Sequence, residues 1–358
     1  MILRTASISP TALAPGGRCS PRIRHRVSFA PRSKVSAFSS IPTLPVDEVT
    51  IDCQSRNKTH FQSELQAIVE PYHRKHQPVV VRGVAKETPA TKLWSSWDYL
   101  RNTAIDDDSD PMVAVEIGGS YGIADSTRAE IPFSAYLQFL QLFEERHGRY
   151  GSLPGETPSA NESDIPTEEL VYMAQNDLLA PLYKDVLIPD FCQNGKIDNL
   201  PGDGTDVPAF ESTEMIGLGR LYSVMMWFGP RGCVSPLHYD PLDNCFLQHL
   251  GRKRVLLFDP SCNGSGWHYA AHEGQQSNTS PIDPQVLDDY SISDGGENID
   301  ETNTLLKDYR KKYPIFFEEA PQRLECLLEP GDLLYIPSRW WHHVRSIDTS
   351  ASVNVWWR

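Results

Sequence analysis

The sequence predicts a mainly β protein with flanking helices, in which short strands form a sandwich or a barrel. Two observations support this prediction: short apolar stretches follow one another closely after Leu218, and turn residues separate them. The expected strands cover residues 221–228, 245–250, 253–259, 323–328, 332–336 and 351–357.

Two of the separating turns are explicit in the sequence. Gly251-Arg252 lies between two strand stretches and predicts a tight hairpin. The segment Glu329-Pro330-Gly331-Asp332 places Pro and Gly where a type II turn needs them. Asp332 is therefore most simply a turn residue.

Helices and strands alternate in the part of the chain before Leu218. Apolar residues recur at helical spacing over residues 61–72, and a second amphipathic helix is expected to begin near Ser134. The runs Pro78–Gly83 and Val113–Ile117 predict buried strands, whereas residues 151–167 and 193–214 have the composition of surface loops. We expect residues 47–214 to form an N-terminal part that packs on a barrel core at 215–358, with a polar insertion at 263–309.

The first 46 residues contain seven basic residues and no acidic residue, and they are rich in Ser and Pro. This composition is typical of an organellar transit peptide or of a disordered basic tail. Seven scattered cysteines, none in a Cys-x-x-Cys pair, favour a reducing intracellular compartment over a disulfide framework or a zinc ribbon. We expect an intracellular protein of the nucleus or cytoplasm, with the mitochondrion as a further candidate.

The chain carries a formal net charge of -14, which disfavours direct binding to nucleic acid and favours a basic protein or peptide partner. A solvated acidic surface that only aids solubility is the simpler explanation. No apolar run reaches the roughly 18 residues that a membrane-spanning helix needs. The sequence leaves the oligomeric state open.

A candidate metal motif lies in residues 235–240, where His238 and Asp240 are separated by one residue. On a strand, residues two apart project from the same face, so an imidazole and a carboxylate can converge on one ion. His342, from a strand far along the chain, supplies a third ligand in a barrel. Two histidines and one carboxylate leave positions open on an octahedral ion, as in non-haem iron(II) oxygenases. A His-x-Asp triplet alone is weak, because a buried histidine is more often only hydrogen-bonded.

From about Gln77 to Arg358 the chain resembles the JmjC-domain oxygenases of the cupin superfamily. It is most similar to the small JmjC protein hydroxylases, which include arginyl hydroxylases that are also labelled lysine demethylases. The run from Pro330 to Val344, with its paired aromatics before His342, carries the resemblance, and the matching stretches are 113–118, 172–175, 188–192 and 227–230. The resemblance implies a double-stranded β-helix, that is, a cupin or jelly-roll barrel.

The resemblance also implies a site that binds iron(II) and uses 2-oxoglutarate and O2 as cosubstrates. It makes His342 rather than His343 the metal ligand, and alternation along a strand directs the two to opposite faces. Lys253 matches the lysine that binds the distal carboxylate of 2-oxoglutarate in this family. The ordinary alternative for Lys253 is a surface lysine in a hairpin. Other cosubstrate positions are matched by Tyr172, Ser235, Asn244 and Asn354.

Three further positions match residues that surround the substrate side chain in the arginyl hydroxylases: Glu116, Tyr121 and Trp227. A carboxylate and an indole face suit a guanidinium, although both aromatics are also ordinary core residues. Many JmjC demethylases use Glu as the carboxylate ligand, so Asp240 favours hydroxylation of a protein side chain, with arginine the candidate. Lysine demethylation, a small-molecule biosynthetic oxygenase and a silent cupin-like binding protein remain as alternatives.

Overall fold

The computed structural model describes residues 43–51, 58–106, 108–121, 127–153, 165–193, 216–260, 278–285 and 323–358, with a few positions between 308 and 316. The basic N-terminal segment, for which a transit peptide and a disordered tail are the alternatives, lies outside the described residues up to residue 42. So do most of the insertion predicted at 263–309 and most of the two predicted surface loops.

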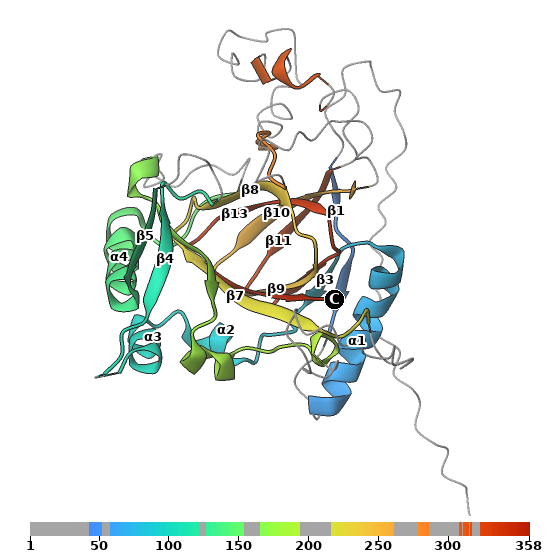
Figure 1. Ribbon diagram of the computed structural model, residues 1–358, viewed down its shortest axis with the longest axis horizontal. Coiled ribbons are helices and arrows are strands. Elements are labelled where there is room, and N and C mark those ends of the chain that lie inside the picture. The colour runs from blue at the N-terminus through green and yellow to red at the C-terminus, as the bar shows by residue number, and fades with distance from the viewer. Residues whose placement is uncertain are drawn as a thin grey trace, which may run out of the picture.

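Two β-sheets face each other and form the body of the protein (Figure 1). The first sheet has nine strands, in the order β2 (Glu48–Thr50), β3 (Val79–Arg82), β12 (Leu333–Ile336), β9 (Asp243–Leu250), β14 (Ser350–Trp357), β7 (Leu221–Gly229), β6 (Val171–Asp177), β4 (Met112–Ile117) and β5 (Thr127–Pro132). The second has five strands, in the order β1 (Thr43–Pro45), β11 (Arg323–Leu328), β10 (Lys253–Phe258), β13 (Trp341–Ser346) and β8 (Val234–Tyr239).

The chain alternates between the two sheets along most of its carboxyl-terminal half. It runs from β7 to β8, β9 and β10, and later from β11 to β12, β13 and β14, and it changes sheet at each of these steps. Within each sheet these strands pair antiparallel, as β12-β9-β14-β7 and as β11-β10-β13-β8. This winding confirms the predicted double-stranded β-helix.

The predicted hairpin at Gly251-Arg252 is wrong, because β9 and β10 do not pair with each other and belong to different sheets. The two residues form a corner between the sheets instead. Gly251 has φ +61°, and a Cβ atom there would lie 2.2 Å from the carbonyl oxygen of Thr349. A short Gly-containing connection suits a hairpin and a corner equally, so the sequence could not separate them.

The turn predicted at Glu329–Asp332 is present and also crosses between the sheets. Gly331 has φ +101°, and the amide of Asp332 donates to the carbonyl of Glu329 over 3.0 Å. Asp332 does more than turn the chain, because its buried carboxylate pairs with Arg82 of β3 and accepts from the Glu329 amide over 2.9 Å. The turn is thereby tied to the neighbouring strand.

The helices cover the outer face of the nine-stranded sheet (Figure 1). Their buried side chains join those of the sheet in the largest apolar cluster, to which α1 contributes Leu65 and α4 contributes Leu140. The predicted helix over residues 61–72 and the predicted helix near Ser134 are confirmed. The helices are α1 (Lys58–Lys75), α2 (Pro89–Leu93), α3 (Trp97–Ala104) and α4 (Phe133–His147), and the short 3-10 turns are η1 (Thr167–Glu169), η2 (Ala180–Asp185) and η3 (Asp190–Cys192).

A second apolar cluster fills the space between the two sheets. Phe246 and Leu334 enter it from the nine-stranded sheet, and Val255 and Val344 enter it from the five-stranded sheet. A third cluster lies on the outer face of the five-stranded sheet, where Ile282 from the predicted insertion is buried. The described part of the insertion therefore covers the barrel wall.

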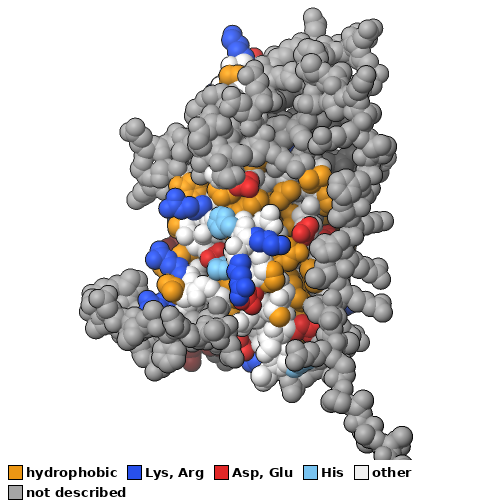
Figure 2. All heavy atoms as spheres, turned by 90° about the vertical axis from the view of Figure 1, so that its right-hand side faces the viewer, with side chains coloured by type: hydrophobic (Ala, Val, Ile, Leu, Met, Phe, Trp, Pro, Cys, Tyr) orange, Lys and Arg blue, Asp and Glu red, His pale blue; other side chains and the backbone are white. Residues whose placement is uncertain are grey.

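Residues 43–46, which the sequence assigned to the basic N-terminal segment, already belong to the barrel. Thr43–Pro45 pairs parallel with β11, and Val46 is buried. The side on which α1 lies mixes basic, acidic and hydrophobic side chains, so no single charge dominates its described part (Figure 2). No helix in the described ranges is long and apolar enough to cross a membrane.

Candidate metal centre

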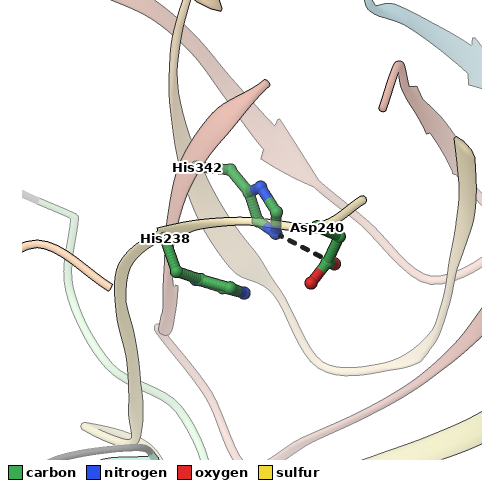
Figure 3. A group of neighbouring side chains, drawn as sticks. All are labelled: His238, Asp240 and His342. Atoms are coloured by element: carbon green, nitrogen blue, oxygen red, sulfur yellow. Dashed lines mark ion pairs between the residues drawn. The ribbon is translucent and has the colours of Figure 1, made fainter. Parts of the chain in front are cut away.

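His238, Asp240 and His342 converge at the inner face of the five-stranded sheet (Figure 3). His238 lies on β8, Asp240 follows the end of that strand, and His342 lies on the paired strand β13. One ligand atom from each residue lies within 4.8 Å of the other two, and the two imidazole centroids are 4.2 Å apart. A single metal ion can therefore contact all three side chains.

Both histidines present the same ring nitrogen to the centre. Nδ1 of His238 lies 2.7 Å from the Pro236 carbonyl oxygen, and Nδ1 of His342 lies 2.9 Å from that of Trp340. A carbonyl only accepts, so each Nδ1 carries the proton and each Nε2 keeps its lone pair for a metal. Burial lowers the pKa of His342 to about 4, with the neighbouring His238 adding to the effect. The imidazole is thus neutral, as ligation requires.

The carboxylate of Asp240 is held from two sides. Its Oδ2 accepts a hydrogen bond of 3.1 Å from the indole nitrogen of Trp356 on β14, and it lies 3.7 Å from Nε2 of His342. An indole donor on one carboxylate oxygen orients the group and leaves the other oxygen for an ion. Trp356 was not among the predicted site residues, because strand alternation alone does not show which partner its indole meets.

A β-bulge places Ser235 on the same face as His238. Ser235 pairs with Val344 and His238 pairs with His342. The two pairs are therefore three residues apart on β8 but only two residues apart on β13. Residues three apart point to opposite faces of a regular strand, and the extra residue restores a common direction. His343 faces the outer side of the sheet, where its Nε2 lies 3.8 Å from Asp283.

A cavity opens beside the three ligands and is lined by side chains from both sheets. The predicted site residues that line it are the two histidines, Asp240, Tyr172, Ser235, Asn354 and Trp227. Its complete lining is Tyr172, Trp227, Ser235, His238, Asp240, Phe246, His342, Val344, Asn354 and Trp356. Phe246 and Trp356 were missed because large apolar residues at these positions are typical of any strand core.

Lys253 is buried behind this cavity with 1% of its surface exposed. Its Nζ donates to the Ser352 hydroxyl over 2.8 Å and lies 5.4 Å from the ring centroid of Phe246 and 5.9 Å from that of Tyr172. No carboxylate in the described ranges pairs with it. Burial lowers the pKa of Lys253 to about 7. The alternative of a surface hairpin lysine is therefore wrong. Burial of a charged ammonium is costly without an anion beside it, so an anionic ligand would stabilise the charged form of Lys253.

Three further polar side chains near the cavity have buried atoms with no hydrogen-bond partner. The atoms without a hydrogen-bond partner among the described residues are both amide atoms of Asn244, Oδ1 of Asn354 and the indole nitrogen of Trp227. Asn244 is two residues from Phe246 on β9, so it shares the face that borders the cavity. Buried polar atoms are normally paired, and a polar molecule in the cavity would satisfy these donors and acceptors.

Of the three predicted substrate residues, Trp227 lines the cavity, Tyr121 contacts Trp227, and Glu116 is the register partner of Tyr172 in the cavity wall. Tyr121 contacts Trp227 edge-on with ring centroids 5.1 Å apart, and its hydroxyl donates to the side chain of Gln175. Glu116 is buried on β4, and its Oε1 lies 3.7 Å from Nε of Arg128 on β5. Neither Gln175 nor Arg128 was predicted. Gln175 has φ +50° within a strand, a conformation that its residue type does not signal.

The chain is similar to known proteins over most of its length. The family model for a cupin-like domain matches residues 65–358. Lysine-specific demethylase JMJ30 of Arabidopsis thaliana is 31% identical over 82% of the chain and 52% of that protein. Jumonji C domain-containing protein 5 of Drosophila melanogaster is 28% identical over 88% of the chain and 63% of that protein. Lysine-specific demethylase 8 of Danio rerio is 29% identical over 93% of the chain and 64% of that protein. The chain thus spans between half and two thirds of the length of these relatives.

Proposed function

The chain belongs to the cupin-like domain family, and from this premise we propose that it is an iron(II)- and 2-oxoglutarate-dependent dioxygenase that hydroxylates a protein side chain. Its relatives carry JmjC names, in line with the resemblance seen in the sequence. The observation that carries the proposal is the buried Lys253, which lies behind the cavity that holds the ligand triad and has no carboxylate partner in the described part of the chain.

The residues present fit both the ion and the cosubstrate. The two imidazoles and the Asp240 carboxylate are the donor set that suits iron(II) with open positions. Lys253 fits the distal carboxylate of 2-oxoglutarate, since a charge-assisted hydrogen bond would complete its pairing. The unpaired amide of Asn244 and the amide oxygen of Asn354 offer further polar contacts.

The protein's own contribution is positioning and the exclusion of water. Bound iron(II) supplies the oxidising chemistry, in which O2 and 2-oxoglutarate are consumed and a C–H bond becomes C–OH. Trp356 orients Asp240, and the backbone carbonyls of Pro236 and Trp340 hold the histidine tautomers. Four aromatic side chains form much of the cavity wall, so a bound side chain is held near the metal away from bulk solvent.

Formation of succinate from 2-oxoglutarate tests the proposal directly. The purified chain is incubated with iron(II), 2-oxoglutarate and O2, and succinate is measured beside a His238→Ala control. We expect turnover above the control, stimulated by a protein extract. Stimulation only by a small-molecule extract would favour a biosynthetic oxygenase. Metal binding without any turnover would favour a silent cupin-like binding protein and refute the proposal.

For the substrate side chain we propose arginine in a basic protein or peptide. Glu116 offers a buried carboxylate and Trp227 an indole face, and the net charge of -14 favours a basic partner. Lysine demethylation is the second candidate, because two of the relatives are named lysine-specific demethylases. Paired peptides decide between them: a gain of one oxygen on arginine supports hydroxylation, whereas loss of a methyl group from methyl-lysine supports demethylation.

A further inference from the structure

An arginine of the chain itself stands opposite the carboxylate of the proposed substrate pocket. Glu116 of β4 and Arg128 of β5 are direct partners in the antiparallel register. Nε of Arg128 lies 3.7 Å from Oε1 of Glu116. The Glu116 side chain is only 6% exposed, whereas that of Arg128 is 59% exposed. A fixed, buried anion is therefore paired with a cation whose side chain projects largely into solvent.

The ion pair is loose in its geometry. A separation of 3.7 Å is longer than a hydrogen bond, so the two groups attract mainly through charge. A buried carboxylate needs a nearby cation, and the guanidinium of Arg128 meets part of that need. Because β5 is the edge strand of its sheet, the Arg128 side chain can leave without disturbing another strand.

The Glu116–Arg128 pair lies beside the metal cavity, because Glu116 is the register partner of Tyr172, which lines that cavity. Tyr121 contacts Trp227, which lines the cavity together with the ligand triad. Burial raises the pKa of the Tyr121 hydroxyl, and the charges of Asp240, Arg128 and Glu116 also act on that group. The three charges are thus within electrostatic reach of one hydroxyl at the side of the cavity.

We propose that Arg128 is a specificity-determining residue, which pairs with Glu116 until a cationic substrate side chain displaces it. The inference rests on the proposed function, because it needs a substrate that uses Glu116. The displacement of Arg128 lowers the binding affinity only of a substrate side chain that pairs with the Glu116 carboxylate. A neutral side chain leaves Arg128 in place. Exposed ion pairs shift an equilibrium by about 1.5- to fivefold, which sets the expected size of the effect.

The test measures peptide binding and needs no turnover. The full chain is loaded with manganese(II) and 2-oxoglutarate without O2, and it is titrated by calorimetry with a short glycine–alanine peptide that carries one central arginine. The same peptide with citrulline is the neutral probe. The variants are Arg128→Gln, which removes the charge, and Arg128→Lys, which keeps it. Arg146→Ala is the matched control, since Arg146 is another exposed arginine that pairs with a glutamate.

We expect Arg128→Gln to bind the arginine peptide about 1.5- to fivefold more tightly than the original chain, with no change for citrulline. Arg128→Lys and Arg146→Ala should match the original chain within twofold or less. If the arginine peptide is preferred but Arg128→Gln binds it equally or more weakly, the inference is refuted and the proposed pocket stands. If no variant prefers arginine over citrulline, including the case in which neither peptide binds, the proposed substrate class fails and the inference fails with it.

Discussion

Replacing Lys253 with Met should stabilise the protein in the absence of 2-oxoglutarate and abolish its binding of 2-oxoglutarate. Met has a similar length and no charge, so it fills the same buried space without an ammonium group. In the original chain this ammonium is 1% exposed, and its one described hydrogen-bond acceptor is the Ser352 hydroxyl. The two effects have opposite signs, which separates a binding residue from a merely structural one.

The magnitude of the stabilisation follows from the pKa. Burial lowers the pKa of Lys253 from 10.5 to about 7. Since each pKa unit corresponds to 1.36 kcal/mol, the charged group costs roughly 5 kcal/mol of folding free energy at low pH. Removing the lysine also leaves the Ser352 hydroxyl without its donor, which costs about 1 kcal/mol. We expect a net gain of roughly 2 to 4 kcal/mol near neutral pH, because packing changes reduce it further.

The gain must also depend on pH in a defined direction. The folded pKa is depressed, so the unfolded chain binds more protons between pH 7 and 10.5, and the stability of the original chain rises with pH over that range. The cost is fully present below about pH 7 and is lost above the unfolded pKa. The advantage of Lys253→Met should therefore shrink steadily as the pH is raised from 7 toward 10.5.

Urea unfolding from pH 6.5 to 9.5 measures this difference, and calorimetry with manganese(II) in place of iron measures 2-oxoglutarate affinity. Loss of one partner of a buried ion pair costs about 3 to 5 kcal/mol, which weakens binding by at least a hundredfold. Asp332→Asn, which lies outside the cavity, is the control for 2-oxoglutarate affinity only, since loss of its charge weakens the pair with Arg82 and lowers the stability. The reasoning is refuted if Lys253→Met is less stable than the original chain at pH 7, or if it still binds 2-oxoglutarate within tenfold.

Three further predictions follow from the contacts at and around the metal centre. His342→Ala should abolish manganese(II) binding in calorimetry while His343→Ala retains it, because the two imidazoles face opposite sides of β13; equal loss would overturn the assignment. Trp356→Phe should weaken metal binding about tenfold, since it removes the donor to Asp240 but keeps an aromatic ring; unchanged affinity would show that the hydrogen bond is incidental. Asp332→Ala should cost about 1 to 3 kcal/mol in urea unfolding, because it removes one of the two carboxylate partners of the half-buried Arg82 and leaves the Glu329 amide without its acceptor; an altered 2-oxoglutarate affinity of the folded protein would contradict its purely structural role.

Local patterns were sufficient for most of the barrel strands. The β-branched run at Val79–Val81 and the apolar stretch at Leu221–Phe228 form strands close to the predicted bounds. Strand partners could not be read in the same way, because pairing depends on contacts between distant segments. The corner at Gly251 shows the difference: its conformation suits a hairpin, and only the assembled sheets show that its two strands never pair.

The sequence by itself determined which residues are available for the chemistry: a His-x-Asp pair at 238–240, a distant histidine after paired aromatics, and Lys253. These are properties of residue type and local spacing. Only the tertiary structure decided which side chains meet, because a bulge in β8 and pairing across the chain set the direction of each group. It buried Lys253 without a carboxylate partner among the described residues, and it paired Glu116 with Arg128, which lies twelve residues along the chain. Burial and charge partnership arise from packing, and no local pattern encodes them.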